Sequence, residues 1–165
     1  MSWSLFQTKC SVLTGQQHVS REQFSQTISD AYHQTMMLHF DTMTAGGKLT
    51  NSQPKVLPLY NGLLSICNAN LMSQTDVHWI QQIGPLFQTY WVGNVIVGPT
   101  GVVTVTSPGT WIGPKIVQNY DFTILLQTLI ATARAHIMTL VGTYVSSVVP
   151  GVTSPWSGAM LQTLP

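Results

Sequence analysis

The chain offers five histidines and five acidic residues for chemistry, and their spacing decides what they could do. His33, His39 and Asp41 fall within one stretch and suggest a metal site at first sight. Metal-binding pairs on a helix are three or four residues apart, because that spacing puts both side chains on one face. The step from His33 to His39 is longer and turns the two side chains away from each other. We therefore expect no metal site.

The acidic residues are isolated in the sequence, at Glu22, Asp30, Asp41, Asp76 and Asp121. General acid and base catalysis by two carboxylates would need distant segments to converge. The sequence contains no nucleophile elbow, no P-loop and no dinucleotide-binding fingerprint. The glycines at 93, 98 and 101 fall in an expected hairpin, where turns need them. We interpret the chain as a non-enzyme, with no catalytic residues and no cofactor.

The two cysteines, Cys10 and Cys67, lack the CxxC spacing of a zinc or redox motif. Free buried thiols are the simplest interpretation, and a disulfide between them stays open as the alternative. Residues 1–11 contain no basic segment followed by a continuous apolar one, which a cleaved secretory signal requires. We expect synthesis and folding in the cytoplasm.

Charged residues make up only 7% of the 165 residues, against about 25% in ordinary soluble domains. The net charge is +1 and the six Lys and Arg residues are scattered. Binding to nucleic acid requires clustered cations, so we expect no direct nucleic-acid partner. A neutral, apolar surface tends to associate, because neither charge repulsion nor strong hydration opposes contact. We favour an obligate assembly of copies of the chain or of the chain with other proteins, and a neutral monomer is the alternative.

Helical periodicity dominates the first half of the chain. Residues 20–44 carry a capping box, Ser20 with Gln23, followed by apolar residues at three- and four-residue steps. The glycines at 46 and 47 are expected to end this helix. A second helix is expected over residues 57–72, and a short third one from Asp76 to the Gly84-Pro85 pair.

The sequence from residue 90 to 117 is rich in β-branched and aromatic residues interrupted by glycine. Valines and an isoleucine at 92–97 and valines at 102–105 flank the turn sequence GPTG, which predicts a β-hairpin. A lone hairpin is marginal in water. It must therefore lie on the helices or extend the sheet of a neighbouring subunit.

Residues 122–149 contain no proline and predict one helix of about 42 Å, at 1.5 Å per residue. We expect this to be longer than one small domain covers by itself. The run could also cross a membrane, as in a holin-like or pore-forming protein, and we keep this as the alternative function. Arg134 and His136 lie at its middle, where a charge is costly in lipid, so a packed helix in an oligomer is favoured.

Together these elements predict one domain over residues 1–165, of the α+β class and mainly α. We expect residues 150–165 to form an extended arm that docks on a neighbouring subunit. Removing them should weaken an oligomer without unfolding the chain. Large apolar residues outside obvious catalytic patterns are our interface candidates: Trp91, Trp111, Leu129, Tyr144, Trp156, Met160 and Leu161.

Two segments carry a family resemblance, FSQTISDAYHQTMMLHFDTMTAGG and YWVGNVIVGPTGVVTVTSPGTW. In their pattern of residues they resemble small virion proteins of tailed bacteriophages, in particular those of the neck and tail of myoviruses. The resemblance implies a non-catalytic subunit of a ring or collar at the neck, tail or baseplate. It also implies other virion proteins as partners and assembly in the host cytoplasm. It transfers no functional residue to this chain.

Overall fold

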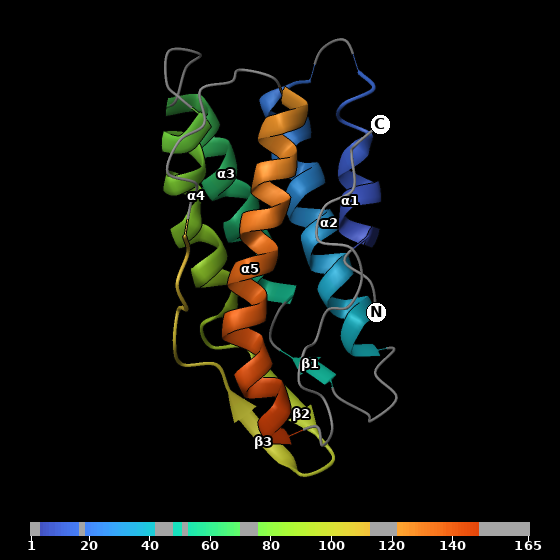
Figure 1. The fold of residues 1–165 in the computed structure, drawn as a ribbon, viewed down its shortest axis with the longest axis vertical. Coiled ribbons are helices and arrows are strands. Elements are labelled where there is room, and N and C mark those ends of the chain that lie inside the picture. Colours follow the sequence, from blue (N-terminus) through green and yellow to red (C-terminus); the bar gives the residue numbers. More distant parts are fainter. Residues whose placement is uncertain are drawn as a thin grey trace.

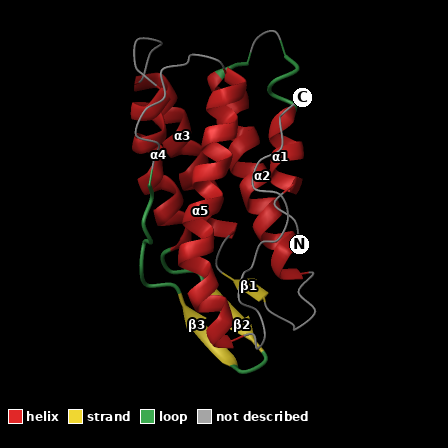
Figure 2. Cartoon of the chain, viewed as in Figure 1, coloured by secondary structure: helices red, strands yellow, loops and turns green. Residues whose placement is uncertain are grey.

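A computed structural model describes residues 4–16, 19–41, 48–50, 53–69, 76–112 and 122–148. The helices run along the long axis of the molecule, and a small sheet closes one end of the bundle (Figures 1 and 2). The elements in chain order are α1 (Ser4–Ser11), α2 (Arg21–Asp41), β1 (Lys48–Thr50), the 3-10 helix η1 (Gln53–Lys55), α3 (Val56–Ala69), α4 (Asp76–Trp91), β2 (Val95–Gly98), β3 (Gly101–Thr104) and α5 (Phe122–Val148). The α+β, mainly helical class is confirmed.

Helix α2 begins as its capping sequence predicts. The Ser20 hydroxyl accepts a hydrogen bond from the backbone N–H of Gln23 at 3.0 Å, which satisfies a donor that the first turn leaves open. One face of α2 is buried, with Phe24, Ile28, Ala31, Tyr32 and Met36. The expected glycine stop at 46 and 47 lies outside the described residues.

Helix α4 does not end at Gly84-Pro85, as we predicted, but continues to Trp91. An interior proline costs about 3 kcal/mol, because it removes one backbone hydrogen bond and crowds the preceding turn. Burial offsets this cost, since Phe87, Tyr90 and Trp91 after the proline are all at most 1% exposed. Gly84 is a point of close approach, because a Cβ atom there would lie 2.5 Å from the Trp111 ring.

The hairpin around GPTG forms as predicted, with Gly98 paired to Gly101 and Val97 to Val102. The sheet also contains β1, which we did not predict, and its order is β1-β2-β3 with antiparallel neighbours. Leu49 and Ile96 are buried on the inner face of the sheet, against the helices. The backbone N–H of Thr100 in the turn donates to the Val148 carbonyl at 3.3 Å, so the hairpin caps the end of α5.

Helix α5 spans the predicted region, but the chain covers it more completely than we expected. Its apolar stripe is at most 4% exposed at Leu126, Leu129, Ile130, Ala133, Ile137, Leu140 and Val148. The helices α1 and α4 and the strands β2 and β3 all contact α5. The length of α5 therefore does not by itself require a partner.

Helix α1, which we did not predict, supplies Phe6 and Cys10 to the core, and Leu13 follows in the next turn. Cys10 is buried and Cys67 is half-buried, and both are free thiols, as the simpler interpretation of the cysteines has it. Burial raises the pKa of both thiols, and for Cys67 this is the largest of several causes. Neither thiol is therefore set up as a nucleophile.

Candidate functional site

The residues that could take part in chemistry or in binding lie in three places. These are a buried aromatic network, a segment docked on α4 and α5, and the sheet. Within the described residues no group of three or more His, Cys, Asp or Glu side chains could hold a metal ion. His33 is buried in the aromatic network. The structure does not describe the side chain of His39.

The buried network joins α2 to α4 through aromatic side chains. His33 Nδ1 lies 2.8 Å from the Tyr90 hydroxyl, and its Nε2 lies 3.0 Å from Gln53 Oε1. The Trp91 indole N–H donates to the Tyr32 hydroxyl at 2.7 Å. Burial raises the pKa of Tyr32 and lowers the pKa of His33, so both groups stay neutral near pH 7. The network satisfies buried polar atoms and fixes the helices, which is a structural role.

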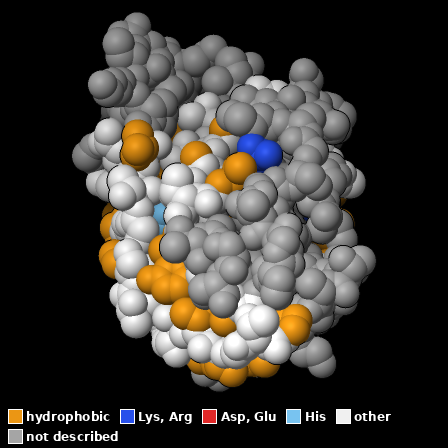
Figure 3. Space-filling view, turned by 60° about the horizontal axis from the view of Figure 1, so that its bottom comes forward, with side chains coloured by type: hydrophobic (Ala, Val, Ile, Leu, Met, Phe, Trp, Pro, Cys, Tyr) orange, Lys and Arg blue, Asp and Glu red, His pale blue; other side chains and the backbone are white. Residues whose placement is uncertain are grey.

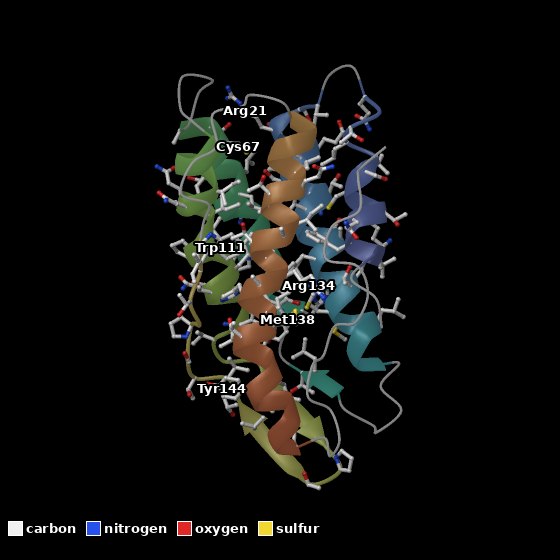
Figure 4. All side chains as sticks on the ribbon, viewed as in Figure 1. Arg21, Cys67, Trp111, Arg134, Met138 and Tyr144 are labelled. Carbon is white, nitrogen blue, oxygen red and sulfur yellow. The ribbon has the colours of Figure 1, made fainter. Side chains whose placement is uncertain are left out.

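Residues 106–112, the SPGTW segment with its neighbours, run over α4 and α5 as a strap. The Trp111 indole N–H donates to the Ile80 carbonyl at 3.0 Å, and its ring stacks on Phe87 with a centroid distance of 5.2 Å. The Tyr144 hydroxyl accepts a hydrogen bond from the Ser107 backbone N–H at 3.1 Å. Figure 4 shows Trp111 beside α4 and Tyr144 nearer the sheet, so the two side chains hold opposite ends of the strap.

His136 holds the middle of the strap. Its Nε2 lies 2.9 Å from the Pro108 carbonyl, which requires a proton on that nitrogen. Its Nδ1 is buried and has no hydrogen-bond partner among the described residues. Burial lowers the pKa of His136, and the bond to Pro108 opposes this only in part. The ring is therefore neutral in the folded protein near pH 7.

This gives a pH prediction for stability. Because the pKa of His136 is lower folded than unfolded, the unfolded chain binds more protons below the ordinary value of 6.5. We expect the free energy of unfolding to be fully retained above pH 6.5 and to fall as the pH drops below it. His136→Gln keeps an N–H donor and cannot titrate, so its urea-unfolding free energy should fall less steeply below pH 6.5. Identical slopes for the two proteins would contradict this assignment, and His33→Gln measures the other buried imidazole separately.

A hollow of about 300 Å³ lies beside the strap and is lined by Lys55, Pro85, Gln88, Thr89, Val92 and Pro108. The Lys55 ammonium donates to the Val92 carbonyl at 3.0 Å, just beyond the C-terminus of α4, where a cation is favourable. The Gln88 amide N–H donates to the Gly109 carbonyl of the strap at 2.7 Å. These polar groups hold the fold together, and they do not form an acid and base pair.

The sheet has a second, outer face that the helices do not cover. The pairing register puts positions 48 and 50 of β1, Val95 and Val97 of β2, and Val102 and Thr104 of β3 on this face, because side chains alternate along each strand. Val102 is 63% exposed, Thr50 and Thr104 are also exposed, and Val95 and Val97 are half-buried. The three strands contain a single charged residue, Lys48, at the start of β1. The outer face is thus a small valine surface with one basic position, Lys48 at the β1 edge, and no acidic residue.

The end of the molecule that holds the sheet is turned toward the viewer in Figure 3. Among the side chains drawn in colour, hydrophobic ones gather in the lower half of this view, a basic group is visible higher up, and no acidic side chain is visible. Other exposed hydrophobic side chains, such as Leu57 and Ile112, come from separate elements and are ordinary for a protein surface. The outer face differs because its apolar residues share one rigid sheet.

The seven interface candidates fall into three groups. Trp91 and Leu129 are 0% exposed, so they are core residues of a single chain and offer no surface to a partner. Trp111 and Tyr144 are half-buried and hold the strap. Trp156, Met160 and Leu161 lie outside the described residues, as does the expected arm. The outer-face valines were missed as a site, although the alternation of the hairpin could have separated its two faces.

Comparisons of the chain with models of protein families, with curated proteins and with solved structures find no match. Among the described residues, no helix is long and apolar enough to cross a membrane, and this includes α5, the helix on which the alternative function rested.

Proposed function

We propose that the chain is a non-catalytic structural subunit that assembles with copies of itself and with other proteins. The observation that carries this proposal is the valine outer face of the sheet, at an end of the molecule with few charges. Burying apolar surface contributes about 25 cal/mol per Å². With few charges to desolvate, little of this gain is lost when two such surfaces meet.

The composition supports the same proposal. With 7% charged residues, the chain has little of the repulsion and hydration that keep proteins apart at high concentration. From the resemblance of its helix and hairpin segments we further propose a viral particle as the setting. There the chain would form part of a ring or collar in the neck or tail region of a tailed phage, next to other virion proteins.

The test is the solution mass of the purified, detergent-free protein, measured by light scattering across a concentration series. We expect a discrete multiple of the chain mass of 18.1 kDa that persists on moderate dilution. A mass of one chain at every concentration would contradict assembly of copies.

A further inference from the structure

Strand β3 is an edge strand in the described part of the chain. The order of the sheet is β1-β2-β3, so β3 pairs with β2 on one side and leaves its other side open. An open edge presents unpaired backbone N–H and C=O groups, to which another strand can add. Proteins usually protect such edges with charge, proline or a bulge. The sequence of β3, GVVT, contains no charge and no proline.

The hairpin register fixes which backbone groups of β3 face outward. Gly98 pairs with Gly101 across a two-residue turn, so hydrogen-bonded and non-hydrogen-bonded pairs alternate from there along the ladder. The bond from the Val105 N–H to the Asn94 carbonyl, at 2.9 Å, fits the same alternation. Val103 therefore directs its N–H and C=O toward β2. Val102 and Thr104 direct theirs toward the open edge.

The charge distribution favours a second copy of the chain as the partner. A two-fold axis at an edge brings a charge that lies near the axis close to its own duplicate, so an edge without charges favours self-pairing. Residues 95–112, which include β2, β3 and the strap, contain no charged residue. The opposite edge differs, because β1 begins with Lys48, two strands away from β3.

We propose that β3 pairs antiparallel with β3 of a second copy, about a two-fold axis at Val103; this rests on the proposed function. Val102 of each chain then lies opposite Thr104 of the other, and their outward groups form up to about four backbone hydrogen bonds. The two Val103 residues face each other as the non-hydrogen-bonded pair. The two sheets become one, and the valines of both outer faces form a continuous apolar surface.

The first test compares two variants, each of which carries one new lysine on the outer face, at the β3 edge or at the β1 edge. Val102→Lys puts a charge at the β3 edge, where both copies would carry it. Thr50→Lys is the matched control, because Thr50 is exposed on the same face at the opposite edge. We expect Val102→Lys to raise the dissociation concentration at least about tenfold, and Thr50→Lys to change it by less than about twofold. Circular dichroism and thermal melting establish that both variants are folded.

The second test is a cross-link at the two-fold axis. In a non-hydrogen-bonded antiparallel pair the Cα atoms are about 4.5 Å apart, which a disulfide can span. Val103→Cys, in a background with Cys10→Ala and Cys67→Ala, should form a covalent dimer under mild oxidation. Thr50→Cys in the same background is the control and should remain largely monomeric on a non-reducing gel.

The outcomes separate this interface from the proposed function. Association of the unaltered chain, loss with Val102→Lys alone, and cross-linking at position 103 alone would support the β3 pairing. Association that both lysine variants retain, without a cross-link at 103, would overturn the pairing and leave assembly through another surface. An unaltered chain that stays monomeric would contradict the assembly of copies in the proposed function, and would overturn the pairing with it.

Discussion

Leu129→Asp should lower the free energy of unfolding by more than about 4 kcal/mol, because it puts an unpaired carboxylate into the core. Leu129 is 0% exposed and belongs to the buried stripe of α5. The cost has two parts, the lost burial of the leucine and the desolvation of the new charge. Urea unfolding, followed by far-UV circular dichroism, measures the change.

Two further variants keep this prediction testable if Leu129→Asp does not fold. Leu129→Ala removes the side chain without adding a charge and should cost about 2–5 kcal/mol. Ala135→Asp introduces the same carboxylate at an exposed position of the same helix and should change stability by less than about 1 kcal/mol. A Leu129→Asp protein that melts like the unaltered chain would contradict the placement of α5 in the core.

Trp91→Ala should destabilise the chain by about 3–5 kcal/mol, because the indole is fully enclosed. Trp91 packs edge-on against Tyr90 at a centroid distance of 5.5 Å, and its N–H donates to the Tyr32 hydroxyl. Its removal would leave a cavity between α2 and α4. Trp91→Phe retains most of the volume and loses the hydrogen bond, which should cost about 1–3 kcal/mol.

The same variants distinguish a core role for Trp91 from the interface role that its residue type suggested. Folded Trp91→Phe should show lower stability and an unchanged solution mass. A variant with unchanged melting temperature and reduced mass would instead assign Trp91 to a contact between chains.

Short sequence motifs predicted the elements that are set by interactions between residues close together in the sequence. The capping box at Ser20 marked the start of α2, and the GPTG turn marked the hairpin, because both signals act over four residues. The three residues of β1 are too few for a periodic pattern, and their strand forms only by pairing with β2. The path of α4 through Pro85 was also not predictable, because the compensating burial comes from distant segments.

The candidate site was predicted in part. The hairpin suggested pairing with a neighbour, and the structure shows that β1 pairs with one side of β2 and that, among the described residues, β3 has a strand partner on one side only. The sequence could not separate core from interface among large apolar residues, because both kinds of position select the same types. Trp91 and Leu129 illustrate this, since each is covered by other elements of its own chain.

The most direct test of the central claim is the solution mass of the detergent-free chain over a concentration series, repeated at low and high salt. Assembly through uncharged surfaces should give a multiple of 18.1 kDa that salt leaves unchanged or strengthens, because salt screens charges but does not weaken apolar burial. A single-chain mass under all conditions would contradict assembly of copies. An oligomer that dissociates as salt is added would contradict the apolar residues of the sheet surface as its basis.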